Sequence, residues 1–233
     1  MNIALLGYGK MGKVIEQIAI NRGHNITLIV DQHKQNLELS NVDVAIDFSM
    51  PESAFNNLKT CFENNTSVVC GTTGWLEQYE EAVALCKSSK SGFIYASNFS
   101  LGVNIFFEVN KVLAKLMKNQ SQYNISLEEI HHTQKLDAPS GTAISLAEDV
   151  ISNSNYEQWQ LDQAGAGVIP ITAIREPEVP GTHTVDYTSE VDTISITHKA
   201  HNRMGFALGA VIAAEWLHGK QGVYSMKDVL DIN

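Results

Sequence analysis

Residues 2–12 read NIALLGYGKMG, and this stretch decides the fold of the first half of the chain. Its apolar opening predicts a buried strand, and the residues that follow have the spacing of a helix. Between the two, Gly7, Gly9 and Gly12 give the pattern GxGxxG. Between a strand and a helix, these glycines allow a tight turn, a close approach of the backbone to a pyrophosphate and packing of the helix on the strand. The stretch therefore predicts a dinucleotide-binding loop.

Asp31 ends the next β-branched run, and Gln32 follows it. A carboxylate at this place accepts hydrogen bonds from the ribose hydroxyls of NAD and repels the 2′-phosphate of NADP. NADH is therefore the favoured cofactor. Lys34 is close enough in sequence to weaken that preference, so NADPH stays open as a second cofactor. The structural alternative is a glycine turn beside a solvated aspartate.

The first half of the chain continues to alternate strands with helices. Strands are expected at 25–31, 42–48, 67–70 and 93–96, and helices at 52–64 and 76–88. Such alternation indicates a doubly wound parallel sheet. The gap of about ten residues before the strand at 42–48 is too short for a crossover helix, so we expect a trimmed Rossmann-type sheet.

Two further loops of the first half, GTTG at 71–74 and ASNFS at 96–100, follow predicted strands. The loops at the carboxyl ends of parallel strands line the ligand crevice of open α/β sheets. We therefore expect both loops to contact the nicotinamide side of a dinucleotide. The alternative is a pair of ordinary polar turns.

The second half of the chain has a different pattern. Helices are expected at 103–118, 140–152, 206–218 and 226–230, and strands at 123–131, 168–174, 183–188 and 192–198. Successive strands with short links indicate an α+β domain with a mixed or antiparallel sheet. In the helix at 103–118, Phe106, Val109, Val112, Leu113 and Leu116 lie near helical spacing and predict its apolar face. A shift in composition near Gly102 marks the domain boundary.

Residues 129–143 read EIHHTQKLDAPSGTA and hold the densest chemistry of the chain. Ser140, Gly141 and Thr142 follow a proline at a predicted helix start, where free N–H groups bind a carboxylate or a phosphate. Lys135 adds a positive charge, and the two histidines before it change charge near neutral pH. The segment can therefore hold an anionic substrate and deliver a proton. The alternative is a capped helix with surface histidines.

The chain carries a net charge of −10, which excludes general binding to nucleic acid. Anions can still bind locally, because no acidic residue occurs from 193 to 214, where His198, Lys199, His201 and Arg203 lie. Three cysteines without CxxC spacing, no apolar run long enough for a membrane span and no signal peptide indicate a cytoplasmic protein. A zinc site at His131, His132, His198 and His201 would lack an acidic or cysteine ligand at supporting spacing, so we expect no metal.

Residues 129–143, the glycine loop, DFS at 47–49, GTTG, SNFS and ITHKA at 196–200 together resemble the bacterial 4-hydroxy-tetrahydrodipicolinate reductase (dihydrodipicolinate reductase) family over nearly the whole chain. The resemblance implies reduction of 4-hydroxy-2,3,4,5-tetrahydrodipicolinate by NADH or NADPH, with loss of water, in lysine (diaminopimelate) biosynthesis. It implies that His131 is a proton donor or acceptor and Lys135 a proton donor. Which of the two delivers the proton stays open.

The resemblance also implies the residues that contact each ligand. The substrate, a small dicarboxylate, would be bound by His132, Lys135, Ser140, Gly141 and Thr142. The dinucleotide would be contacted by Gly7, Tyr8, Gly9, Lys10, Met11, Gly12, Asp31, Gly71, Thr72, Thr73, Ala96, Ser97, Asn98 and Phe99. Arg203 has two open interpretations: it holds a substrate carboxylate or the hinge, or it forms a structural salt bridge.

The family architecture implies a dinucleotide-binding domain over 1–101 that is completed by the C-terminal helices at 206–233. A substrate-binding and oligomerisation domain would occupy 102–205. Family tetramers assemble through the sheet of the second domain, and we expect a homotetramer here through exposed apolar faces of the strands at 168–198. The short segments at 31–42 and 152–167 depart from longer members.

Two other classes of protein compete with this interpretation. One is another Rossmann-fold oxidoreductase, but a semialdehyde dehydrogenase needs an activated cysteine, and no nearby base supports Cys70. A sugar dehydrogenase would need its own acid/base segment, which 129–143 does not resemble. The other class is a non-catalytic dinucleotide sensor that binds a partner protein, which would have no need for a His–Lys segment beside an anion-binding helix.

Overall fold

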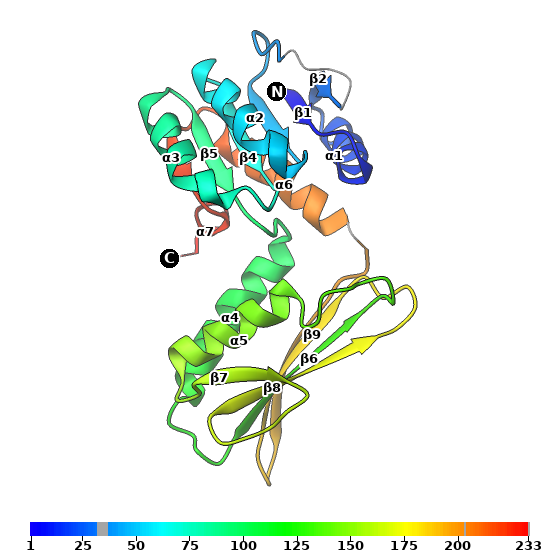
Figure 1. The fold of residues 1–233 in the computed structure, drawn as a ribbon, viewed down its shortest axis with the longest axis vertical. Helices are drawn as coiled ribbons and strands as arrows, with labels where there is room; N and C mark the ends of the chain where they lie inside the picture. Colours follow the sequence, from blue (N-terminus) through cyan, green and yellow to red (C-terminus); the bar gives the residue numbers. More distant parts are fainter. Residues whose placement is uncertain (32–36, 203, 233) are drawn as a thin grey trace. The chain divides into compact units, whose positions relative to one another are not determined.

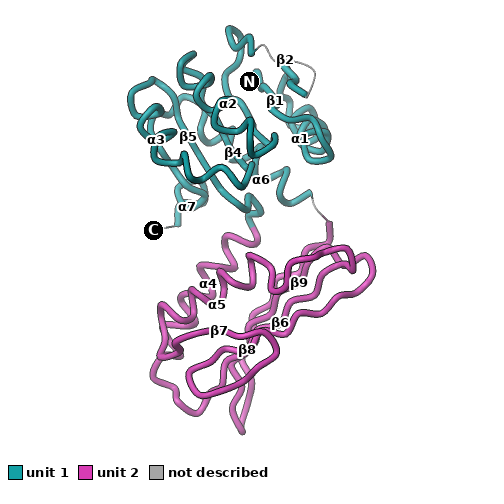
Figure 2. Tube along the Cα trace, viewed as in Figure 1, with its two compact units in different colours: residues 1–101, 204–233 teal, residues 102–203 magenta. Residues whose placement is uncertain are grey.

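The computed structural model describes residues 1–31, 37–202 and 204–232. The chain forms two compact units (Figures 1 and 2). The first contains Met1–Leu101 together with Met204–Asn233, and the second contains Gly102–Arg203. The C-terminal segment therefore belongs to the same unit as the N-terminal half of the chain.

The first unit is built on a six-stranded sheet with the strand order β11-β5-β4-β3-β1-β2. Its strands are β1 (Asn2–Leu6), β2 (Asn25–Val30), β3 (Val44–Asp47), β4 (Ser67–Cys70), β5 (Gly92–Tyr95) and β11 (Gly222–Tyr224). All neighbouring strands are parallel, which confirms the predicted parallel sheet. Between β2 and β3, the described residues 37–43 contain no helix, as expected for a trimmed sheet. The pattern missed β11.

Helices cover both faces of this sheet (Figure 1). They are α1 (Lys10–Asn21), α2 (Pro51–Glu63), the short η1 (Leu76–Gln78), α3 (Tyr79–Ser88), α6 (Met204–Leu217) and α7 (Met226–Val229). Ile15 of α1 and Ala210 of α6 belong to the core on one face, whereas Leu58 of α2 and Cys86 of α3 belong to the core on the other. This two-sided cover confirms a doubly wound α/β fold.

The second unit contains a five-stranded sheet with the strand order β10-β9-β6-β8-β7. Its elements are α4 (Leu101–Met117), β6 (Asn124–His131), α5 (Gly141–Asn153), β7 (Gln158–Leu161), β8 (Val168–Arg175), β9 (Thr182–Thr188) and β10 (Thr193–Lys199). The sheet is mixed, because β6, β8 and β7 are parallel whereas β9 is antiparallel to both β6 and β10. This confirms the predicted mixed sheet, although β7 was missed.

One face of this second sheet forms a core with α4 and α5. Leu127 and Ile171 from the strands pack in one apolar cluster with Leu146 and Val150 of α5 and Phe106 of α4. The alternation of side chains along β6, with Ile125, Leu127, Glu129 and His131 all buried, places this row on the covered face. Two charged or titratable groups therefore lie in the same row as the core residues.

The apolar face predicted for α4 is only partly right. Phe106 is buried, but Val109, Val112 and Leu116 are exposed to 45%, 57% and 69%. The buried positions of the helix include the polar Asn110, whose side chain donates to the carbonyl of Leu146. Because α4 is apolar on two sides, the periodicity alone does not show which side meets the sheet.

The prediction of exposed apolar faces on the strands at 168–198 is wrong for β9 and β10. Their residues on the face away from the helices carry hydroxyl and carboxylate groups, such as Thr184 bonded to Thr197 and Ser195 bonded to Asp186. In β8, Val168, Pro170 and Ile174 lie on that face, together with the polar Thr172. Among the described residues, no helix is long and apolar enough to cross a membrane.

Candidate active site

The glycine loop lies between β1 and α1, and each of its glycines has a separate reason. Gly7 has φ of +98°, and a Cβ there would lie 2.2 Å from the carbonyl oxygen of Phe48. A Cβ on Gly12 would lie 2.4 Å from the carbonyl oxygen of Gly7, so this glycine lets α1 approach the loop. A Cβ on Gly9 would meet nothing within 4 Å, and no side chain caps the helix start there. The backbone at Gly9 is therefore open to an anionic ligand.

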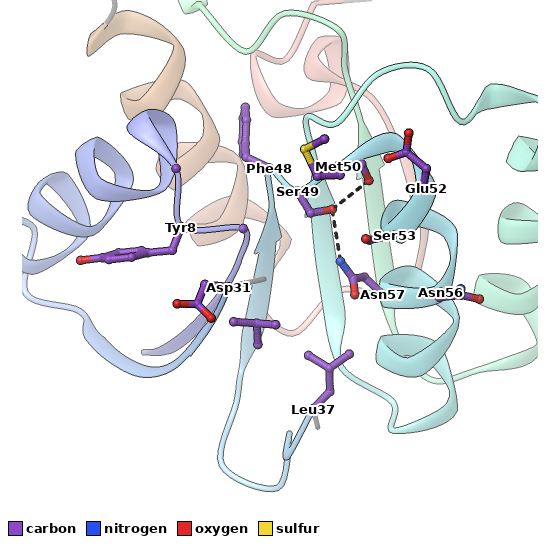
Figure 3. Close-up of a pocket in the computed structure, with 13 residues that line it drawn as sticks. Tyr8, Asp31, Leu37, Phe48, Ser49, Met50, Glu52, Ser53, Asn56 and Asn57 are labelled. Carbon is purple, nitrogen blue, oxygen red and sulfur yellow. Dashed lines mark hydrogen bonds between the residues drawn. The ribbon is translucent and has the colours of Figure 1, made fainter. Parts of the chain in front are cut away.

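A cavity of about 580 Å³ opens beside this loop, next to the carboxyl ends of β1, β2 and β3 (Figure 3). It is lined by Gly7, Tyr8, Gly9, Val30, Asp31, Leu37, Phe48, Ser49, Met50, Glu52, Ser53, Asn56 and Asn57. The sheet order reverses between β1 and β3, which is where open α/β sheets bind ligands. Four of the residues predicted to contact a dinucleotide, Gly7, Tyr8, Gly9 and Asp31, line this cavity.

Asp47, at the end of β3, joins the loops beside the cavity. Its fully buried carboxylate accepts hydrogen bonds from the Thr72 hydroxyl at 2.5 Å, the Asn57 amide at 2.7 Å and the Ser49 hydroxyl at 3.0 Å. Burial raises the pKa of Asp47, and these donors oppose the rise. The Thr72 hydroxyl is therefore committed to the protein interior, which the polar composition of the GTTG loop did not show.

The remaining predicted cofactor residues divide between loop surface and core. Thr73 and Ser97 are exposed, whereas Phe99 is 1% exposed. Phe99 packs closely against Gly209, where a Cβ would lie 1.7 Å from the carbonyl oxygen of Phe99. Asn98 accepts a hydrogen bond from the backbone N–H of Ser100. Lys10, Met11 and Gly12 form the first turn of α1, and Gly71 and Ala96 follow β4 and β5 directly. The side chain of Phe99 thus serves the fold.

In the second unit, the segment 129–143 runs from β6 through a loop into α5. Ser140 is the N-cap of α5, and its hydroxyl accepts a hydrogen bond from the N–H of Ala143. Gly141 is exposed and Thr142 half-buried in the first turn. This geometry confirms the predicted helix start, and its free N–H groups favour an anion. His132 follows the last residue of β6 and is half-buried.

Lys135 lies in the loop of this segment and is paired with a residue that the sequence analysis did not single out. Its ammonium group lies 2.9 and 2.8 Å from the two carboxylate oxygens of Asp137. The carboxylate is mostly exposed, and the hydrogen bond from Lys135 lowers the pKa of Asp137. A dicarboxylate ligand would therefore compete with Asp137 for this lysine.

Glu129 is a fully buried carboxylate in the middle of the segment's hydrogen-bond network. It accepts the backbone N–H of Ser140 at 3.0 Å and the guanidinium of Arg175 at 3.1 Å. Burial by itself would raise the pKa of Glu129, but these donors and the neighbouring His131 outweigh it, and the net pKa is lowered. The group is thus a carboxylate anion at neutral pH.

Two buried histidines surround this carboxylate. Nδ1 of His131 lies 3.6 Å, and Nε2 of His183 lies 3.9 Å, from the same oxygen of Glu129. Their rings are 5.0 Å apart, and Nε2 of His183 is also 3.2 Å from the Ser140 hydroxyl. Burial lowers the pKa of His131, although the charge of Glu129 opposes that effect. Burial also lowers the pKa of His183, to about 4.

Sequence reasoning missed Arg175 and His183, because strand pairing brings them to the segment. Arg175 lies beside His131 across the β6–β8 pair, and His183 lies beside Glu129 across the β6–β9 pair. One signal was available: both are polar residues at inward positions of otherwise apolar alternating strands. The site therefore has five groups. The segment 129–143 supplies Glu129, His131 and Ser140, and strand pairing adds Arg175 and His183.

Among the described residues, one group has the spacing of possible metal ligands, namely Glu129, His131 and His183. It shares only His131 with the four histidines that the sequence offers as zinc ligands. Both oxygens of its carboxylate already accept hydrogen bonds, one of them from Arg175. The neighbouring guanidinium already pairs with this carboxylate and disfavours a metal ion beside it.

Several earlier predictions concern other positions. Gln32, Lys34 and Arg203 lie outside the described residues, so their interpretations stay predictions. His198 packs near the ring of Phe106 and stands beside His183 across the β9–β10 pair. Cys61, Cys70 and Cys86 are buried free thiols, and burial raises the pKa of Cys70, which argues against a thiolate nucleophile.

A Rossmann-type sheet with a glycine-rich loop and a separate mixed-sheet unit with a buried acid/base cluster define a two-domain, dinucleotide-dependent oxidoreductase. Comparison with known proteins narrows this class. The profile described as dihydrodipicolinate reductase, N-terminus, matches residues 1–99, and the one described as dihydrodipicolinate reductase, C-terminus, matches residues 102–230. The chain belongs to the dihydrodipicolinate reductase family, whose members are oxidoreductases that use NADH or NADPH.

Individual relatives agree with this assignment. A 4-hydroxy-tetrahydrodipicolinate reductase from Christiangramia forsetii is 57% identical over 99% of this chain and 98% of its own length. The enzyme of that name from Neisseria gonorrhoeae is 35% identical over 84% of this chain and 75% of its own. A dipicolinate-bound dihydrodipicolinate reductase from Paenisporosarcina has the same fold, with a TM-score of 0.80, 23% identity and 97% coverage of both chains.

Proposed function

We propose that this protein catalyses the reduction of 4-hydroxy-2,3,4,5-tetrahydrodipicolinate to 2,3,4,5-tetrahydrodipicolinate, with loss of water, in lysine (diaminopimelate) biosynthesis. The observation that carries the proposal is the 57% identity, over almost the full length of both chains, to a relative that is named for this substrate. The cluster around Glu129 agrees with it, because a cyclic dicarboxylate needs anion-binding donors and a proton source at one place. Neither a semialdehyde dehydrogenase nor a dinucleotide sensor accounts for both features.

The residues of the second unit would supply binding and proton transfer. The backbone N–H groups of Gly141 and Thr142, at the start of α5, would donate hydrogen bonds to one carboxylate of the substrate. Lys135 would exchange its contact with Asp137 for the developing negative charge on the reduced substrate. His131 lies beside the Glu129 carboxylate and would exchange a proton with the substrate, and His132 follows it at the end of the same strand. Either His131 or Lys135 can deliver the proton that completes the reduction.

The residues of the first unit would hold the dinucleotide. It supplies a hydride when it is bound. The open backbone at Gly9 and the uncapped start of α1 suit a pyrophosphate, and the exposed Asp31 in the cavity suits the adenosine ribose. The loops that contain Gly71, Thr73, Ser97 and Asn98 would face the nicotinamide side.

Turnover is the direct test of the proposed function. The substrate is made fresh from pyruvate and aspartate semialdehyde by the preceding synthase, and loss of the reduced nicotinamide absorbance is followed with NADH and then with NADPH. We expect a loss of absorbance that depends on both the protein and the synthase. No loss with either cofactor would refute the proposal.

NADH is the proposed preferred cofactor, because Asp31 and Glu52 place two carboxylates in the cavity wall. In Asp31→Ser, the ratio of the NADH to the NADPH value of kcat/KM should fall by about tenfold or more, since tenfold corresponds to about 1.4 kcal/mol of lost repulsion. Glu63→Ser, at an exposed position at the end of α2, is the control. An unchanged ratio in Asp31→Ser would contradict the assignment.

A homotetramer that assembles through the sheet of the second unit is also proposed, on the basis of family membership. The face of this sheet away from α4 and α5 presents hydroxyl groups on β9 and β10 and apolar groups on β8, so the contact would be mixed in character. Light scattering after size exclusion tests it. A monomeric mass at micromolar concentration would contradict it.

A further inference from the structure

None of the proposed binding and proton-transfer roles belongs to Glu129, although it is a fully buried charge between His131, His183 and Arg175. Its side chain has no exposed surface, and its two oxygens are contacted from β6, β8, β9 and the start of α5. A buried ion pair contributes little net stability, because desolvation offsets the attraction. Its presence beside two histidines therefore points to a task in the chemistry.

The ring of His131 lies between the Glu129 carboxylate and the backbone of Gly181. Nδ1 is buried, has no hydrogen-bond partner and lies 3.6 Å from the Glu129 carboxylate. On the other side of the ring, a Cβ at Gly181 would lie 3.2 Å from Nε2, so only a glycine backbone fits there without displacing the imidazole. A small movement of the ring would close the gap to Glu129 and form a charge-assisted hydrogen bond when the ring is protonated.

Arg175 links this carboxylate to the loop that carries Lys135. Its Nη2 donates to Oε1 of Glu129 at 3.1 Å and to the carbonyl of Asp137 at 2.7 Å, and its Nε donates to the carbonyl of Lys135 at 3.3 Å. The planar guanidinium therefore fixes the loop and the carboxylate with one rigid group. Through the Ser140 N–H, the same carboxylate also holds the start of α5.

We propose that Glu129 and Arg175 act together as positioning residues. They hold His131, the Lys135 loop and the start of α5 in the relative positions that proton transfer requires. Glu129 faces the buried Nδ1 of His131 and leaves Nε2 as the nitrogen for the substrate. Neither residue contacts the substrate. The logic is that of a base or acid oriented by a third group. This inference rests on the proposed function, but its first readout does not require turnover.

The charged and titratable groups that face His131 come from four places. They are Glu129 of the same strand, Arg175 of β8, His183 of β9, and Lys135 and Asp137 of the loop. The anion of Glu129 favours the protonated ring, whereas Lys135 and Arg175 disfavour it. Removing the negative charge of Glu129 must therefore make His131 a stronger acid.

The test compares Glu129→Gln with Glu128→Gln, which removes the same charge one residue earlier on an exposed side chain of the same strand. Histidine ring resonances are titrated by NMR, with His131 assigned through its own replacement. In Glu129→Gln, the pKa of His131 should fall by about 1 relative to the wild type, as expected when a neighbouring opposite charge is lost. In Glu128→Gln it should not change.

Kinetics supply the second readout. In Glu129→Gln, kcat should fall at least about tenfold, which is part of the 10²–10⁴-fold rate increase that a positioned acid contributes. The basic limb of the pH profile should move to lower pH together with the pKa of His131. A fall in kcat without either shift would indicate a merely structural role and overturn the proposal. If His131 shifts but the wild type does not reduce the substrate, the pairing stands and the proposed function fails.

Arg175→Lys tests the role of Arg175, and it keeps the proposal testable if Glu129→Gln does not fold. Lysine keeps the positive charge but cannot reproduce the fork that reaches two carbonyls and a carboxylate. The pKa of His131 should stay near its wild-type value, whereas kcat/KM should fall at least about tenfold because the loop loses its register. A wild-type kcat/KM in Arg175→Lys would overturn the role of Arg175.

Discussion

The two units build their candidate sites in opposite ways. In the first unit, Gly7, Gly9 and Gly12 stand within six consecutive residues at the junction of β1 and α1, and Phe48, after β3, also restricts Gly7. In the second unit, the cluster takes Glu129, His131, Ser140, Arg175 and His183 from three strands and a helix start. A local motif tolerates changes elsewhere, whereas a cluster assembled by strand pairing depends on the register of the whole sheet.

The largest expected effect comes from removing His131, one of the two candidate proton donors of the second unit. His131→Ala should lower kcat by about 10²–10⁴, the range of a positioned acid or base, and should abolish the basic limb of the pH profile. The dissociation constant of NADH, measured by fluorescence titration, should not change, because the residues proposed to bind the dinucleotide belong to the first unit. His218→Ala, a half-exposed histidine at the end of α6, is the control. A change in NADH affinity would contradict the assignment of dinucleotide binding to the first unit and proton transfer to the second.

The next effect concerns the stability of the second unit. His183 has a pKa of about 4 in the folded protein, whereas an unfolded histidine has its ordinary value of 6.5. Between these values the unfolded state binds more protons, so stability is present above pH 6.5 and is lost as the pH falls toward 4, by up to about 3 kcal/mol. Urea unfolding at pH 7.5 and 5 measures it.

His183→Gln should flatten that pH dependence, because glutamine does not titrate and can still bond to the Ser140 hydroxyl. His218→Gln should retain the slope of the wild type. If His183→Gln and the wild type lose equal stability between pH 7.5 and 5, His183 is not the group responsible.

The smallest effect falls in the first unit, at Thr72, whose hydroxyl donates to the buried Asp47 carboxylate. Thr72→Val should cost about 1–3 kcal/mol of unfolding free energy, because the buried Asp47 loses a donor. Thr73→Val, on an exposed side chain of the same loop, should cost little. Equal losses in the two variants would contradict the structural role of Thr72.

The same contrast explains which parts of the protein the sequence could predict. Strands with β-branched runs, the GxGxxG loop and the Ser140 helix start were predictable because their signals are local. β7 and β11 were missed because they are short and weakly patterned. The prediction for α4 was partly wrong because the helix is apolar on two sides. Phe106 is buried, whereas Val109, Val112 and Leu116, which were expected on the same buried face, are exposed. Tertiary contacts decide between such faces.

The candidate site divides in the same way. His131, Lys135 and Ser140 stood in one motif, and the family resemblance gave them roles. Arg175 and His183 reach the motif only through pairing of β6 with β8 and β9, and no single-sequence pattern gives a pairing register. Asp137 was visible beside Lys135, but its contact with the ammonium group required the conformation of the loop.

Lys135→Ala tests most directly whether proton delivery and dinucleotide binding belong to different units. The measurement is the single-turnover rate of substrate reduction together with the dissociation constant of NADH for the same preparation. We expect a rate lower by about 10²–10⁴ and an unchanged NADH affinity. An NADH affinity that collapses with the rate, or a rate equal to that of the wild type, would contradict it.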